Sequence, residues 1–160
     1  MNNLEIERKF LLDLNKIPYD FSTLNKKSIE QGYIIYKPEI RIRNVSNEDY
    51  FMTIKNDTKE ALVRNEVEFK ISKEAYNALI ARDDIYKINK NRYFVNEGNH
   101  VYEIDIFEGK LKGLACLEVE FPSKEDAENF VIPNWIVKEV TEDVRYRSSY
   151  LAKNSIPVEV

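Results

Sequence analysis

The stretch LEIERKF, residues 4–10, sets Glu5, Glu7 and Lys9 at alternate positions. In an extended strand, successive side chains point to opposite faces, so these three residues share one face and Ile6 and Arg8 share the other. A strand in a globular protein usually buries one face and exposes the other to water. The stretch therefore predicts a strand with one charged face. The fold depends on whether that face meets bulk water or an enclosed space.

Composition narrows the class of protein. The chain has 160 residues, is 43% hydrophobic and lacks a twenty-residue apolar run, which predicts one domain over residues 1–160 and no membrane span. The start, MNNLEIERKF, shows no secretory signal pattern, and Cys116 is the only cysteine, so a cytoplasmic location is expected. The net charge of −4 argues against a nucleic-acid partner. The single histidine, His100 in the predicted turn NEGNH, excludes metal sites built on several histidines.

Extended segments dominate the chain and are separated by short turn sequences such as SNED, NEGN and EGKLKG. We expect strands over about 3–12, 28–37, 39–46, 49–56, 61–71, 84–96, 100–108 and 115–121. Helices are expected at 72–83, 123–130 and 144–153, with a short helix or loop at 13–24. Hairpin-length gaps favour antiparallel neighbours. The predicted class is α+β with a mostly antiparallel sheet.

The charged face of the first strand recurs in six further strands. By the same alternation, the shared faces carry the acids Glu5, Glu7, Glu66, Glu68, Glu103, Asp105, Glu118 and Glu120 and the bases Lys9, Arg41, Arg43, Lys55, Arg64, Lys90 and Arg92. An ordinary solvated sheet face is the plain alternative, but such a face usually mixes in serine, threonine, asparagine and glutamine. Eight antiparallel strands can instead close into a small barrel. We therefore predict a closed eight-stranded antiparallel β-barrel, a tunnel with a few flanking helices, whose lining is this charged face.

A lining of many ionised groups is costly unless the groups pair, hydrogen-bond or bind ions. Carboxylates bind Mg²⁺ or Mn²⁺ through oxygen, and guanidinium groups bind phosphate oxygens with two hydrogen bonds. The mixture of acids and bases therefore points to a metal-bound polyphosphate as the ligand.

Seven motifs in order along the chain resemble the triphosphate tunnel metalloenzymes, also called the CYTH superfamily. They are EIERK at 5–9, QGY at 31–33, RIR at 41–43, TIK at 53–55, RNEVEF at 64–69, KNRY at 90–93 and YEIDIFEGKLKGLACLEVEF at 102–121, followed by EVTEDVRYRSSYLA at 139–152. The resemblance implies an eight-stranded antiparallel tunnel that binds triphosphates with a divalent metal, as in the short bacterial members. The superfamily includes tripolyphosphatases, thiamine triphosphatases, class IV adenylyl cyclases and RNA triphosphatases.

The resemblance also implies roles for individual residues. Glu5, Glu7, Glu118 and Glu120 would hold a metal, and Glu66 and Glu68 would serve a second metal or the attacking water. Lys9, Arg41, Arg43, Lys55, Lys90 and Arg92 would bind the phosphate chain. Tyr33, acting with Lys9, is the candidate proton acceptor, provided that nearby cations lower its pKa. Arg64, Glu103 and Asp105 lie at the edge of the set and could equally form a structural ion-pair network. Ser148 stands where many relatives carry asparagine, which makes Asp143, Arg145 and Tyr146 less secure as site residues.

The predicted activity is hydrolysis of a triphosphate, inorganic tripolyphosphate or a nucleoside triphosphate, by in-line attack of a metal-activated water. Mg²⁺ and Mn²⁺ fit the oxygen ligands equally well. An adenylyl cyclase on the same scaffold, which makes cyclic AMP and pyrophosphate from ATP, is one alternative. A polyphosphate-binding module without catalysis is another. The resemblance also allows a homodimer.

Overall fold

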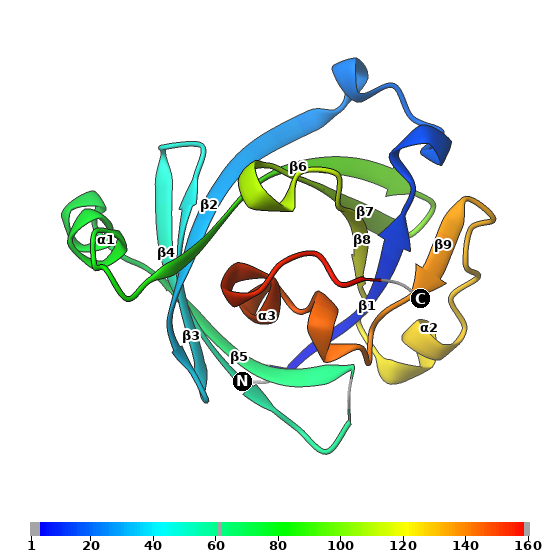
Figure 1. The fold of residues 1–160 in the computed structure, drawn as a ribbon. Helices are drawn as coiled ribbons and strands as arrows, with labels where there is room; N and C mark the ends of the chain where they lie inside the picture. The colour runs from blue at the N-terminus through cyan, green and yellow to red at the C-terminus, as the bar shows by residue number, and fades with distance from the viewer. Residues whose placement is uncertain (1–3, 61, 159–160) are drawn as a thin grey trace.

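The structure, a computed structural model, describes residues 4–60 and 62–158. Its strands are β1 (Leu4–Leu12), β2 (Asn25–Tyr36), β3 (Glu39–Val45), β4 (Asp49–Asp57), β5 (Val63–Lys70), β6 (Tyr86–Glu97), β7 (His100–Phe107), β8 (Ala115–Glu120) and β9 (Ile136–Glu139). The strand order is β5-β4-β3-β2-β6-β7-β8-β1-β9, and an additional pairing of β5 with β1 closes β1 to β8 into a ring (Figure 1). This closure confirms the predicted eight-stranded antiparallel barrel.

The helices are short and lie at the ends and on the outside of the barrel. They are α1 (Lys73–Ile80), α2 (Lys124–Glu128) and α3 (Ser148–Lys153), with 3-10 turns at Leu14–Lys16, Phe21–Thr23, Gly109–Leu111 and Val144–Tyr146. Ser72 and Ser123 cap α1 and α2 by accepting hydrogen bonds from the amides of Ala75 and Asp126. Among the described residues, every helix is too short or too polar to cross a bilayer.

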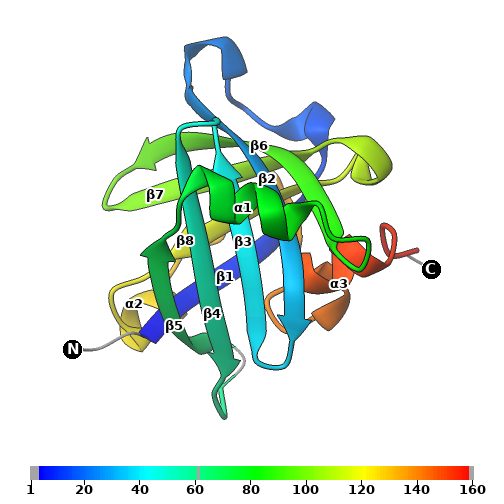
Figure 2. The ribbon, with the colours of Figure 1, turned by 90° about the vertical axis from the view of Figure 1, so that its left-hand side faces the viewer.

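The apolar core lies mainly outside the ring of strands, because the charged faces point inward. One cluster includes Phe10, Ile104, Leu117 and Phe130 and lies on the outer face of β1, β7 and β8, near α2. A second, with Ile42 and Tyr76, lies under α1, which crosses the outer face of β3 and β4 (Figure 2). The barrel therefore has its apolar face turned outward and covered in part by helices, as the charge pattern predicted.

A third cluster fills one end of the barrel interior. Leu151 and Ala152 of α3 pack against Tyr33, Ile88 and Phe107, and α3 lies within the ring in Figure 1. The sequence analysis expected a helix at 144–153 but not this position. The lining is thus charged along its middle and apolar where α3 enters.

The structure differs from the expected elements in several places. The helix expected at 144–153 is divided into the 3-10 turn Val144–Tyr146 and α3, and α2 is shorter than the expected 123–130. Strand β2 begins at Asn25, three residues early, because Asn25 to Ser28 pair with β6. Strand β9, which was not predicted, pairs with β1 at Phe10 to Leu12. The expected strands that start at residues 3 and 61 begin outside the described residues.

Gly32, in the QGY motif, sits where β2 passes closest to the segment that follows α1. A Cβ atom at this position would lie 2.6 Å from Ile85 Cγ2 and 2.7 Å from Ile80 Cδ1. Both contacts are shorter than van der Waals packing permits, and Ile80 is itself packed into the cluster under α1. The glycine is therefore needed for close packing on the outside of the barrel.

We predict that Gly32→Ala lowers the free energy of unfolding by about 1–3 kcal/mol, because the added methyl group overpacks this contact. Urea unfolding followed by circular dichroism measures the change. Ser28→Ala, at an exposed position of the same strand, should change stability by less than about 0.5 kcal/mol. A Gly32→Ala protein as stable as the wild type would contradict the packing argument.

Candidate active site

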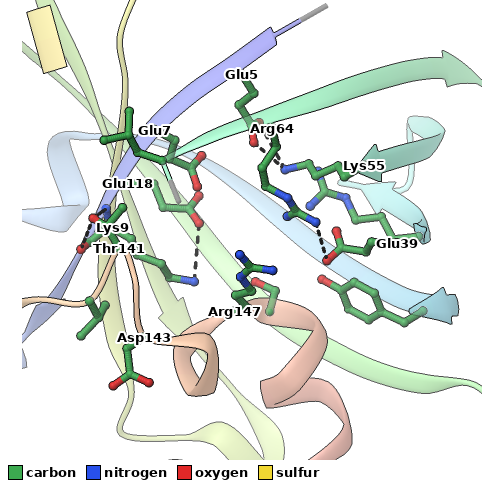
Figure 3. A pocket seen from close by; sticks show the side chains of 15 residues that line it. Glu5, Glu7, Lys9, Glu39, Lys55, Arg64, Glu118, Thr141, Asp143 and Arg147 are labelled. Atoms are coloured by element: carbon green, nitrogen blue, oxygen red, sulfur yellow. Dashed lines mark hydrogen bonds and ion pairs between the residues drawn. The ribbon is translucent and has the colours of Figure 1, made fainter. Parts of the chain in front are cut away.

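Two cavities inside the barrel share Glu5, Glu7, Arg41, Lys55, Glu118 and Ser148 as lining residues. The larger has a volume of about 270 Å³, and all of its other lining residues are charged: Arg43, Glu66, Glu68, Lys90, Arg92 and Glu120. The smaller, of about 70 Å³, lies beside α3 and includes Lys9, Tyr33, Glu39 and Arg64 (Figure 3). The cavities bring together residues from seven of the eight barrel strands.

The alternation rule located most of the charged side chains on the barrel strands. Every residue predicted to hold metal or phosphate lines one or both cavities. Glu103 and Asp105 of β7 do not line them, but they pair with residues that do. The charged faces therefore meet each other across an enclosed space.

On the wall formed by β6, β7 and β8, bases and acids neutralise one another. Arg92 donates to Asp105 (2.8 and 2.9 Å), Glu103 (2.6 Å) and Glu118 (2.7 Å), and Lys90 donates to Asp105 (2.8 Å). Burial opposes ionisation of Glu118, but Arg92 and Lys9 hold its pKa well below the usual value. Burial lowers the pKa of Lys90 to about 8, although Asp105 opposes that shift. This wall is a structural ion-pair network with one side open to the cavity.

Arg41 and Arg43 of β3 have a different environment. Within residues 4–60 and 62–158, neither forms an ion pair, and Arg41 Nε is buried without a hydrogen-bond partner. Arg43 Nε donates to Gln31 Oε1 at 3.0 Å, which is a neutral acceptor. Burial, together with repulsion from Arg41 and Arg92, lowers the pKa of Arg43 to about 10. Two guanidinium groups thus face the cavity without a paired carboxylate.

Acids gather at Glu5 and Glu7 of β1 and Glu120 of β8. One carboxylate oxygen from each of the three lies within 4.8 Å of the others. Burial and the neighbouring Glu118 and Glu5 raise the pKa of Glu7 well above the usual value, and burial with repulsion from Glu103 raises that of Glu120 to about 7. Glu5 is the exception: burial opposes its ionisation, but Lys55, 2.9 Å away, together with Glu66 and Arg41 lowers its pKa. A divalent cation would relieve this repulsion, so the donor set fits Mg²⁺ or Mn²⁺.

The remaining predicted metal ligands differ in their contacts. Glu118 is occupied by Arg92 and lies 3.7 Å from Lys9 Nζ, so its contacts favour a role in holding these bases. Glu68 accepts a hydrogen bond from Thr53 Oγ1 (2.8 Å). Glu66 lies 3.5 Å from Lys55 Nζ, and burial with the neighbouring Glu5 raises its pKa to about 7. Glu66 is thus the acid best placed to exchange a proton near neutral pH.

Tyr33 lines the smaller cavity and accepts a hydrogen bond from Gln31 Nε2 (2.7 Å). Burial and the nearby Glu39 raise its pKa, although Arg41, Arg43 and Lys55 oppose the shift. A tyrosine that accepts a proton near neutral pH would need a lowered pKa. The condition attached to the predicted role of Tyr33 is therefore not met, and its contacts favour a role as a hydrogen-bond donor or a packing residue.

Sequence reasoning missed several residues in or beside the cavities. Glu39 continues the alternation of EIRIR and pairs with Arg64 (3.4 Å), and Gln31 continues that of QGY. The same period of two could have identified both. Thr141 and Arg147 come from the C-terminal segment, which has no such periodicity. Arg147 pairs with Asp57 at 3.2 Å.

Comparison with known proteins shows the following similarities. The family model described as "CYTH domain" matches residues 3–149. The chain is 36% identical over 157 residues to an inorganic triphosphatase of Nitrosomonas europaea, covering 96% of this chain and 99% of that protein. It is 33% identical over 153 residues to an inorganic triphosphatase of Acetivibrio thermocellus, covering 94% of each. A crystal structure of an inorganic triphosphatase matches with a TM-score of 0.68 and 34% identity, covering 96% of this chain and 97% of the other.

The raised pKa of Glu120 leads to a prediction about stability. Between pH 4.5, the usual value, and about 7, the folded state binds more protons than the unfolded chain, so this group lowers stability as the pH rises. At pH 8 without metal, Glu120→Gln should therefore raise the melting temperature. Because Glu120 is partly exposed, the gain should be about 1 kcal/mol or less, or a few degrees.

Differential scanning calorimetry at pH 8 and pH 4.5 measures the effect, which should vanish at the lower pH. Added Mn²⁺ should stabilise the wild type more than the variant. Glu128→Gln, an exposed change on α2, serves as the control. A Glu120→Gln protein that melts below the wild type at pH 8 without metal would refute the repulsion at this site.

Proposed function

The chain belongs to the CYTH domain family, and from that premise we propose that it is a divalent-metal-dependent triphosphatase acting on inorganic triphosphate. The two curated relatives bear the name inorganic triphosphatase and span nearly the whole chain. The proposed reaction adds water to the terminal phosphorus and breaks the bridging P–O bond, giving phosphate and pyrophosphate.

The observation that carries this proposal is the unpaired state of Arg41 and Arg43. Burial opposes the charged form of Arg41, but nearby acids such as Glu39 and Glu5 raise its pKa, whereas burial and repulsion lower that of Arg43. Neither guanidinium group has a carboxylate in direct contact, and phosphate oxygens match their hydrogen-bonding geometry. Lys55, Lys90 and Arg92 add positive charge around the larger cavity. A polyanion in this cavity would supply the oxygen acceptors that Arg41 and Arg43 lack.

Glu5, Glu7 and Glu120 are the residues proposed to hold the metal, because their clustered carboxylates need a cation. When bound there, a divalent cation neutralises charge on phosphate oxygens and promotes ionisation of a water. The ammonium of Lys9 and the guanidinium groups of Arg41 and Arg43 would stabilise the charge that develops on the transferred group and on departing pyrophosphate. Glu66, with a pKa of about 7, is suited to accept the proton of the attacking water.

The lining also bears on the choice of triphosphate. The larger cavity is lined by charged side chains and Ser148. A nucleobase is usually held by apolar or aromatic surface and a few hydrogen bonds, and no residue of this lining offers an apolar surface. We therefore favour the inorganic chain over a nucleoside triphosphate, and hydrolysis over the cyclase reaction.

The proposal includes a cytoplasmic setting, supported by the buried free thiol of Cys116. The proposal allows a homodimer as well as a monomer, and either Mg²⁺ or Mn²⁺ as the bound ion. Size-exclusion chromatography with light scattering tests the first, and the assay below tests the second.

A substrate panel tests the proposed activity. With Mg²⁺ or Mn²⁺, tripolyphosphate should be hydrolysed with a kcat/KM about tenfold or more above those of ATP and thiamine triphosphate, because the lining contacts only the phosphate chain. Phosphate release and ³¹P NMR identify the products. Cyclic AMP with pyrophosphate from ATP would establish the cyclase alternative. Tight tripolyphosphate binding without phosphate release would establish the binding-module alternative.

Variants of the lining test the assigned residues. Glu7→Gln removes a proposed metal ligand, and Lys55→Ala removes a base that lies 2.9 Å from Glu5. Each should lower kcat by about a hundredfold or more, since preorganised charges at the reacting group are lost. Lys124→Ala, in an exposed pair with Glu60, is the matched control. Wild-type rates in both lining variants, with the fold intact by circular dichroism, would refute the assigned site.

A further inference from the structure

Strand β1 changes partners along one edge, directly beside the active site. Its first residues, Leu4 to Ile6, pair with β5, and its last, Phe10 to Leu12, pair with β9. The other edge pairs with β8 from Glu7 to Leu11, so β5 and β9 share one edge. The change of partner falls between Glu7 and Lys9, where the Glu7 amide donates to the Leu62 carbonyl (3.1 Å) and the Val140 amide donates to the Lys9 carbonyl (2.8 Å).

The Thr141 side chain fills this junction. Thr141 Oγ1 accepts a hydrogen bond from the Lys9 amide at 3.0 Å and donates to Glu139 Oε2 at 2.6 Å. The hydroxyl group thus takes the place of a strand carbonyl on this edge. Because the Thr141 hydroxyl group both accepts and donates a hydrogen bond, two partners fix its orientation.

The network continues on the outside of the barrel. Arg8, which lies between Glu7 and Lys9, points outward and binds Glu139 with two hydrogen bonds, at 2.8 and 2.6 Å. Arg8 also donates to the Ala127 carbonyl at 2.8 Å. Inside the barrel, Lys9 Nζ donates to the Tyr146 carbonyl at 2.6 Å. The three residues Glu7, Arg8 and Lys9 are therefore held from both faces.

We propose that Thr141 is a positioning residue, which holds the backbone at Glu7 to Lys9 through its bond to the Lys9 amide and so sets the affinity of the acidic cluster for a divalent cation. Thr141 would act through Glu7 and Lys9 and not touch the reacting atoms. The inference rests on the proposed function for the metal at Glu7, and its test is designed to be independent of turnover.

The reason lies in the spacing of the acidic cluster. Glu7 shares its cluster with Glu5 on the same strand and Glu120 on β8. A shift of β1 at the junction would move Glu7 relative to Glu120, and residues that orient metal ligands commonly affect metal affinity. Thr141 and Leu62 also line both the smaller cavity and an outer cavity bounded by Arg8 and Glu139. They form the wall between the site and the outside at the point where the strands part.

The test compares Thr141→Val with Thr141→Ser. Valine keeps the shape and removes the hydroxyl group, while serine keeps the hydroxyl group. Thr23→Val is the matched control. It removes a hydroxyl group that donates to the Asp20 carbonyl, at a site far from Thr141 in the sequence. Mn²⁺ binding to metal-free protein is measured by calorimetry, and exchange of the Lys9 amide by ¹⁵N NMR.

In Thr141→Val, we expect Mn²⁺ affinity to fall by about ten- to a hundredfold and the Lys9 amide to exchange faster relative to amides of β7. Thr141→Ser should bind Mn²⁺ within about threefold of the wild type, because its hydroxyl group can make both hydrogen bonds. If the valine variant does not fold, Thr141→Ala removes the same group with less bulk, and the same losses are expected.

Wild-type Mn²⁺ affinity and Lys9 exchange in Thr141→Val would overturn the inference. Equal losses in Thr141→Ser and Thr141→Val would also overturn it, since the hydroxyl group would then not matter. Absence of hydrolysis by the wild-type protein would contradict the proposed function alone, because both readouts are made without substrate.

Discussion

Charged side chains that face into a closed ring of strands must find their counter-charges inside it. On β6, β7 and β8 this protein provides them, since Arg92 binds Asp105, Glu103 and Glu118. Elsewhere the balance is uneven. Arg41 and Arg43 of β3 form no ion pair among the described residues. The carboxylates of Glu5, Glu7 and Glu120, by contrast, lie close together. A metal-bound polyphosphate carries both signs and would complete both groups at once.

The same constraint explains where the apolar residues lie. Because the inward faces are charged, Ile104, Leu117 and Ile42 point outward and need cover from outside the ring. Helix α1 covers part of one outer face, and α2 lies near another. At one end of the barrel the inward faces are apolar instead of charged, and Leu151 of α3 packs there against Tyr33 and Ile88. The apolar end shields the ion-pair network from water on that side, which strengthens the charge interactions in the middle of the barrel.

Burial and neighbouring charges give different pKa values to residues that look alike in the sequence. Glu118 and Glu120 are two positions apart on one face of β8, yet Arg92 and Lys9 lower the pKa of Glu118, whereas burial and neighbouring acids raise that of Glu120 to about 7. The first is suited to hold bases in place, and the second to bind a cation. Tyr33 shows the same effect, because its burial outweighs the cations around it and raises its pKa.

The amino-acid sequence by itself determined which side chains share a face, because a strand has a fixed period of two and LEIERKF, RIR, TIK and LEVEF all follow it. It also determined that the acids and bases would be balanced, and hence that the strands could close around them. Only the tertiary structure decided which acid meets which base, since pairs such as Arg92 and Glu118 depend on the register between strands. It alone placed β9, Thr141 and α3. A four-residue strand carries no periodic signal, and the helix expected near the C-terminus takes its position from the barrel opening that it fills.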